Sequence, residues 1–132
     1  MNDPITTEAA LRMTDAELNA AVADALGLIY HVPAGGTVWV DRDDGTPEAS
    51  SEAFSPVRRP EDCADVERWL LARNITILTN VSLAHVWVGW LLPGMSAVKY
   101  VGVDDAPDPI AARCRCICSI AVSIASSAKL SA

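Results

Sequence analysis

The stretch ITILTNVSLAHVWVGWLLPGMSAVKYVGV, from Ile75 to Val103, decides the fold that this sequence predicts. Residues 75–79 are mostly β-branched, which favours a strand. Residues 85–92 fit a second strand, and Pro93-Gly94 is a turn signal before a third strand at residues 97–103. The sequence therefore predicts an antiparallel sheet made of consecutive strands.

The middle strand of this stretch places a tryptophan on each of its two faces. Side chains alternate along a strand, so Trp90 shares one face with Val86 and Val88, whereas Trp87 shares the other with Gly89. A sheet with one face in water would show a cleaner alternation of apolar and polar residues. We therefore expect both faces to be covered and both tryptophans to be buried. The fold class that follows is α+β, a three-layer α/β/α sandwich with a mainly antiparallel sheet and about three helices.

Two helices are expected before this sheet segment. Thr14 and Glu17 form a capping box that would begin the first helix, and Gly27 would end it. Pro60 favours the first turn of a second helix, which would end at Asn74. Both helices are therefore delimited by local signals at their two ends.

The remaining elements complete a single domain. A final helix is predicted from residues 107–109 onward, because apolar residues recur there at helical spacing. Short strands are expected at residues 28–32 and 37–40. The predicted organisation is an N-terminal extension at residues 1–13, one domain at residues 14–126 and a frayed tail at residues 127–132.

The composition limits the location and the partners of the protein. The chain has 132 residues, 51% of them hydrophobic, which is enough for one core without disulfides or a metal. Its net charge of −7 disfavours direct binding to nucleic acid or to an anionic membrane. Neither a signal-peptide pattern nor an uninterrupted apolar run of about eighteen residues is visible. We therefore expect a cytoplasmic protein with reduced cysteines.

A long polar loop is predicted at residues 41–56. Binding residues concentrate in loops, and this loop is the most acidic part of the chain. A calcium site is not expected, because the carboxylates have the wrong spacing for an EF-hand loop and residue 51 is a serine. The loop is instead a candidate protein-binding surface. Its acidic residues are Asp41, Asp43, Asp44, Glu48 and Glu52.

The cysteines and histidines form no metal-binding or catalytic pattern. On a helix, Cys114 and Cys118 share a face while Cys116 points away, and zinc sites usually take cysteines from tight turns. The better interpretation is that these thiols are small buried hydrophobic groups. His31 and His85 each lie in a predicted strand, without a partner at a characteristic spacing. We therefore expect no enzyme activity, no catalytic residue, no metal site and no cofactor.

Arg58 and Arg59 form the one local basic spot, just before the second predicted helix. Because a helix N-terminus attracts anions, the pair is a candidate site for a phosphate-bearing ligand. The alternative is a solvated pair that offsets the charge of the acidic loop.

Several segments of the chain resemble the phage ABA sandwich domain family, which consists of small proteins of tailed phages and prophages. These segments are MTDAELNAAVADALG, FSPVRRPEDCADVERWLLARN, VWVGW and DAPDPIAARCRCICSIAV. The resemblance covers most of residues 13–126. It implies a three-layer fold and a phage origin, and it brings no shared catalytic mechanism.

Three functional hypotheses follow from the charge and from this resemblance. The first is a phage-encoded, non-enzymatic protein that inhibits a host antiviral defence component, as an anti-CRISPR does, by docking an acidic surface on a basic site. The second is a sponge for a nucleotide immune signal, which would use Arg58 and Arg59. The third is a structural or regulatory phage protein. The expected partner is a host cytoplasmic protein with a basic surface, without contact to nucleic acid or membrane, and a homodimer is left open.

Overall fold

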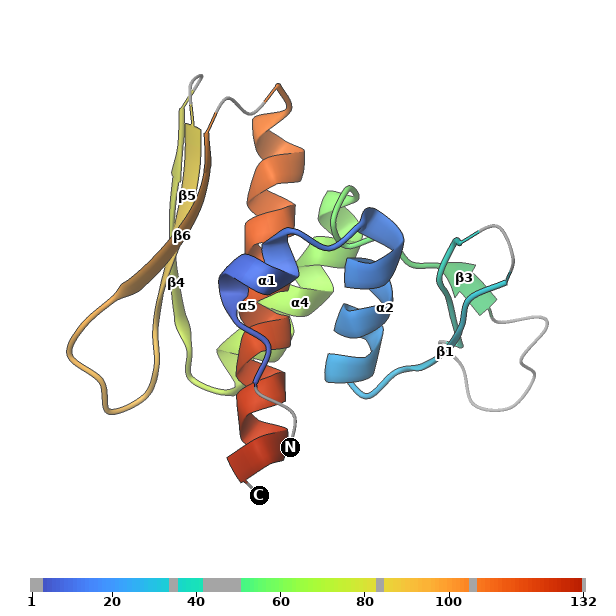
Figure 1. Cartoon of the computed structure of the whole chain (residues 1–132), viewed down its shortest axis with the longest axis horizontal. Coiled ribbons are helices and arrows are strands. Elements are labelled where there is room, and N and C mark those ends of the chain that lie inside the picture. The colour runs from blue at the N-terminus through green and yellow to red at the C-terminus, as the bar shows by residue number, and fades with distance from the viewer. Residues whose placement is uncertain (1–3, 34–35, 42–50, 83–84, 105–106, 132) are drawn as a thin grey trace.

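The computed structural model describes residues 4–33, 36–41, 51–82, 85–104 and 107–131. Within these ranges the chain forms four helices and two three-stranded antiparallel sheets (Figure 1). The α+β class predicted from the sequence is confirmed. The helices are α1 (Thr7–Leu11), α2 (Asp15–Ala25), α4 (Pro60–Ala72) and α5 (Pro109–Ser131). The strands are β1 (Ile29–His31), β2 (Trp39–Asp41), β3 (Ser51–Ala53), β4 (Thr76–Val81), β5 (His85–Leu91) and β6 (Lys99–Asp104).

The ends of α2 follow the local signals in the sequence. The backbone N–H of Glu17 donates to the hydroxyl of Thr14 at 3.1 Å, and the backbone N–H of Thr14 donates to the carboxylate of Glu17 at 2.9 Å. This capping box satisfies two donors that the first helical turn leaves without partners. At the other end, Gly27 takes a positive φ of 74°, which costs glycine little.

The ends of α4 also lie where the sequence predicts them. Pro60 occupies the first turn, where its missing N–H costs no hydrogen bond. Asn74 follows the helix with a φ of 59°, a left-handed conformation that asparagine tolerates. This turn allows the N–H of Ile75 to donate to the carbonyl of Leu70 at 3.1 Å and directs the chain into β4.

The last helix, α5, is the centre of the molecule. It contacts α1, α2 and α4, and it also contacts all three strands β4, β5 and β6 (Figure 1). Every residue from Cys116 to Val122 is buried, so these two turns are enclosed on all sides. A helix can be enclosed in this way only if it is apolar all round. This explains why Cys116 is buried although it points away from Cys114 and Cys118.

The segment that the sequence suggests is an N-terminal extension carries α1, which packs on α5. Ala10 is fully buried in the core, and Ile5 and Leu11 are partly buried against it. Two hydrogen bonds add to this contact: the N–H of Ile5 donates to the hydroxyl of Ser126 at 2.8 Å, and Arg115 Nε donates to the carbonyl of Leu11 at 3.0 Å. The helix α1 is therefore part of the packed structure. At the opposite end of the chain, α5 continues as far as Ser131.

The three-layer sandwich is not confirmed. Figure 1 shows the helices lying between the two sheets, with β4–β6 on one side and β1–β3 on the other. Among the described residues, helices pack against one face of the β4–β6 sheet, and this face carries Val86, Val88 and Trp90. On the other face Trp87 is 40% exposed, so the prediction that both tryptophans are buried is wrong for Trp87. The helices gather around the buried segment Cys116–Val122 of α5 and, in the described part of the chain, do not cover the outer face of the sheet.

Candidate functional site

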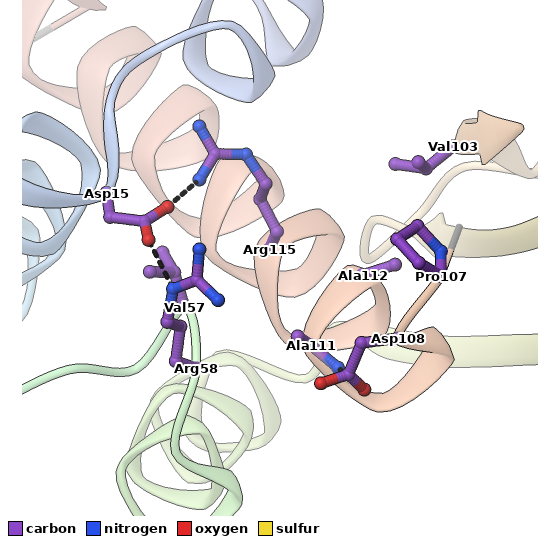
Figure 2. Close-up of a pocket in the computed structure, with 9 residues that line it drawn as sticks. All are labelled: Asp15, Val57, Arg58, Val103, Pro107, Asp108, Ala111, Ala112 and Arg115. Carbon is purple, nitrogen blue, oxygen red and sulfur yellow. Dashed lines mark hydrogen bonds and ion pairs between the residues drawn. The ribbon is translucent and has the colours of Figure 1, made fainter. Parts of the chain in front are cut away.

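Asp15, the first residue of α2, connects two arginines that are far from it in sequence (Figure 2). One carboxylate oxygen accepts from Arg115 Nη1 at 2.7 Å, and the other is paired with Arg58 Nε. The same interaction with Asp15 raises the pKa of Arg58 above its ordinary value. The sequence-predicted ligand residue Arg58, in the turn before α4, is thus held by a carboxylate on α2.

Next to this group lies a small hollow of about 220 Å³ at the start of α5 (Figure 2). Asp108 caps that helix, because its carboxylate accepts from the N–H of Ala111 at 3.2 Å. The hollow is lined by two arginines and two aspartates, so the formal charges of its lining sum to zero. Pockets for small molecules usually have about 300–1,000 Å³, so this hollow is small for a ligand site. Its lining residues are Asp15, Val57, Arg58, Val103, Pro107, Asp108, Ala111, Ala112 and Arg115.

Arg59 points to a different carboxylate from the one that holds Arg58. Its Nε lies 3.7 Å from the carboxylate of Asp62 in the first turn of α4, and its Nη1 donates to the carbonyl of Ala53 at 3.5 Å. Asp62 is itself buried and accepts from the backbone N–H of Ser55 at 2.9 Å. The two arginines are therefore each paired with a different acid and do not converge on one point.

Most of the acidic loop lies outside the described residues. Asp43, Asp44 and Glu48 fall within residues 42–50, which lie outside the part of the chain that the structure describes. The backbones of Asp41 and Glu52 belong to the neighbouring strands β2 and β3, where Asp41 pairs with Ser51 and Val40 with Glu52. The prediction of a loop over residues 41–56 is therefore wrong for Ser51–Ala53, which form strand β3 paired with β2.

The four cysteines are all free and buried, as expected for small hydrophobic groups. A hydrogen bond between Cys63 on α4 and Cys114 on α5 raises the pKa of Cys63 and lowers that of Cys114. Burial raises the pKa of Cys118, and it raises that of Cys116 to about 11. Among the described residues, no three His, Cys, Asp or Glu side chains are grouped so that they could hold a metal ion.

The outer face of the β4–β6 sheet carries an exposed aromatic pair. The ring centroids of Trp87 on β5 and Tyr100 on β6 lie 5.1 Å apart in an edge-to-face arrangement, and Tyr100 is 53% exposed. The Tyr100 ring covers Gly89, where a Cβ atom would lie only 2.8 Å from the ring. Gly89 therefore allows the tyrosine to lie flat against the sheet beside the tryptophan. A hollow of about 260 Å³ opens on this face, lined by Leu78, Thr79, Asn80, Trp87, Gly89 and Tyr100.

Sequence reasoning missed this aromatic face because it assigned both tryptophans to the core. A signal was present in the strand itself. Trp87 shares its face with His85 and Gly89, whereas Trp90 shares its face with two valines. A histidine on one face indicates a less buried surface than two valines do. The pairing of Gly89 with Tyr100 requires the strand register and could not be read from spacing alone.

The helix α5 has the length and composition of a membrane span over residues 109–128, with a mean hydropathy of 1.4. Core helices of soluble proteins pass the same test, and 44% of this segment is buried inside the fold, so this is weak evidence for a membrane location. No protein-family model matches this chain, and no curated protein or solved structure matches it either.

Proposed function

We propose that this domain is a non-enzymatic binding protein that docks on a basic protein surface through the outer face of its β4–β6 sheet. The observation that supports this most directly is the exposed pair of Trp87 and Tyr100. Large aromatic side chains dominate binding energy at protein interfaces, because they bury much area with little loss of side-chain entropy. The pair is held in place before any partner arrives, by its mutual contact and by the packing of Tyr100 over Gly89.

The same face favours a cationic partner. An arginine or lysine over an aromatic ring gains roughly 0.5–2 kcal/mol, and the chain already contains one such contact, with Arg73 Cζ 3.8 Å from the ring centre of Trp69. Asp104 pairs with His85 across the two strands and adds a carboxylate beside the aromatic pair. With a net charge of −7, the whole molecule attracts a basic surface and speeds the encounter.

A binding role without catalysis agrees with the placement of the titratable groups. His31 lies on β1 and His85 on β5, so the two histidines belong to different sheets. The acidic groups described around the Asp15 hollow are engaged by arginines or by a backbone N–H. General acid–base catalysis requires a positioned acid or base that can reach a substrate, whereas these acids are engaged with partners inside the protein.

The biological setting of this proposal comes from the sequence resemblance. In a tailed phage, the basic partner would be a host defence protein that the domain inhibits, and the acidic residues 41–52 would contribute to the long-range attraction. The nucleotide-sponge alternative has less support, because Arg58 and Arg59 are paired with different carboxylates. A ligand phosphate would compete with these carboxylates for two guanidinium groups that are turned to different partners.

Titration with a hexa-arginine peptide, followed by calorimetry and by the indole N–H signal of Trp87, tests the proposal. We expect the peptide to shift that signal and hexaglutamate to leave it unchanged. Trp87→Ala should weaken the binding of hexa-arginine about tenfold, since truncating a hot-spot aromatic usually costs more than 1 kcal/mol. Leu71→Ala is the matched control, because Leu71 is 70% exposed on α4, away from the sheet face.

A second variant separates the sheet face from the acidic loop. Reversing Asp41, Asp43 and Asp44 to Lys should slow the association and reduce its salt dependence, while the Trp87 signal still shifts at saturation. Binding that is unchanged in Trp87→Ala but lost in the triple reversal would overturn the proposal and assign the contact to the loop. Binding lost only in Arg58→Ala and Arg59→Ala, with a nucleotide as probe, would favour the sponge.

A further inference from the structure

The strand β4 lies at the edge of its sheet and is unusually exposed. The strand order is β4–β5–β6, so β4 pairs with β5 on one side and, among the described strands, with none on the other. Five of its six side chains are exposed and only Ile77 is partly covered. Leu78 and Val81 are 47% and 48% exposed, although both are apolar.

This edge also lacks the features that usually keep sheet edges from pairing with other chains. Natural edge strands carry charges, prolines or bulges that block the addition of another strand. The other edge strand of the sheet, β6, has Lys99 at one end and Asp104 at the other. In contrast, residues 74–84 contain no charged residue and no proline. A short, β-branched, uncharged segment with an open edge is a template for another strand.

We propose that β4 pairs antiparallel with β4 of a second copy of this chain, which joins two β4–β5–β6 sheets into one six-stranded sheet. The charge distribution favours a second copy at this place. Two chains of net charge −7 repel each other over most of their surfaces. The strand β4 itself carries no charge, and Glu67 and Arg113 beside it form an ion pair with each other, so self-association costs least there. A two-fold axis perpendicular to the sheet relates the copies and makes one uncharged surface complementary to itself.

The alternation of side chains restricts the register of this pairing. Residues directly opposite each other must lie on the same face, so the two-fold axis passes through a residue and not between two residues. When the axis passes through Thr79, Thr79 faces its own copy and Ile77 faces Val81 of the second copy. Both contacts are favourable, because threonine pairs and apolar pairs stabilise neighbouring strands. The exposed side chain of Val81 is then covered.

Sedimentation equilibrium of the whole chain at about 100 µM, where a micromolar interface is mostly occupied, tests the pairing. We expect twice the chain mass of 14.0 kDa. Thr79→Lys places two lysines opposite each other and should raise the dimer dissociation constant at least tenfold, and Thr79→Glu should do the same with two glutamates. An equimolar mixture of the two variants should form a heterodimer, because opposite charges then face each other across the axis.

Three controls keep the test independent of folding and of the proposed partner. Circular dichroism of Thr79→Lys should match that of the unchanged chain, since Thr79 is exposed. Ile29→Lys places the same charge on the exposed strand β1 of the other sheet and should leave the dimer intact. The dimer should depend little on salt, whereas binding of hexa-arginine weakens with salt, so failure of one proposal is distinguishable from failure of the other.

Either of two results would overturn the inference. One is a monomeric mass for the unchanged chain at this concentration. The other is a dimer that neither Thr79→Lys nor Thr79→Glu weakens, which would assign the interface to another surface. A mixture of the two variants that remains monomeric, while each variant is folded, would contradict the register through Thr79.

Discussion

Trp87 and Trp90 lie three residues apart on β5 and meet opposite environments. Trp90 is 7% exposed against the core, and Trp87 is 40% exposed beside Tyr100. Trp90→Ala should cost about 3–5 kcal/mol in the free energy of unfolding, because it removes a buried ring. Trp87→Ala should cost only about 1 kcal/mol, mainly from the lost edge-to-face contact. Urea unfolding of both variants measures the difference, and equal losses would contradict a sheet that is packed on one face.

Cys116 makes the stability of the protein sensitive to alkaline pH. Burial raises its pKa to about 11, from an ordinary value of 9.0. Below pH 9 the thiol is protonated in both the folded and the unfolded chain, so the free energy of unfolding does not depend on pH through this group. As the pH rises from 9 to about 11, the unfolded chain loses this proton first, and stability should fall by about 1.4 kcal/mol per pH unit from this group.

Urea midpoints at pH 8, 9 and 10 in the presence of a reductant test this dependence. Cys116→Ala should be less stable at every pH, because it leaves a small cavity, but its stability should fall less steeply above pH 9. The other buried thiols titrate in both proteins, so the difference between the slopes reports Cys116. Parallel curves for the two proteins would show that the thiol ionises equally well in the folded chain.

At the scale of single elements, the sequence predicts best what local chemistry decides. The capping box at Thr14, the glycine after α2 and the asparagine after α4 act within a few residues, so their positions could be read directly. The helix α1 was not recognised, because its five residues carry a weak pattern and are held by α5, about a hundred residues later in the chain. The Arg58–Asp15 pair was missed for the same reason, since its two residues are 43 positions apart.

Removing residues 1–12 should therefore destabilise the protein, although the sequence pattern suggests no effect. The truncation uncovers the part of α5 against which Ala10 packs, and it removes the carbonyl of Leu11 that Arg115 binds. We expect a loss of about 3 kcal/mol, comparable to exposing one or two buried aliphatic side chains. This corresponds to a fall of roughly 10 °C in the melting temperature.

A matched pair of substitutions distinguishes packing from a general effect of truncation. Ala10 is fully buried and Ala9 is exposed on the same helix. Ala10→Leu should cost about 1–3 kcal/mol by overpacking, whereas Ala9→Leu should be nearly neutral. An unchanged melting temperature after truncation, or equal effects of the two leucines, would separate α1 from the core.

At the scale of the whole molecule, the order of the layers could not be predicted from the sequence. The sequence predicts the helices and strands other than α1 and β3, but it does not say which helix lies at the centre. The central position depends on α5 being buried on all sides from Cys116 to Val122. The helical spacing of apolar residues in the sequence indicated only one buried face. With α5 at the centre, the other helices pack around it, and the outer face of the β4–β6 sheet remains in solvent with its aromatic pair.

The central position of α5 predicts which part of the protein opens last. Amide hydrogens in Cys116–Val122 are enclosed by α1, α2, α4 and the larger sheet, so they should exchange only when the whole chain unfolds. Amides of β1, whose first residue Ile29 is 72% exposed, should exchange much faster through local opening. Hydrogen exchange measured by NMR in increasing urea tests this order, because exchange through global unfolding accelerates with denaturant and local opening does not. Equal protection of the two segments, or fast exchange in α5, would mean that this helix leaves the core without unfolding the rest, as a helix that transfers into a membrane would have to do.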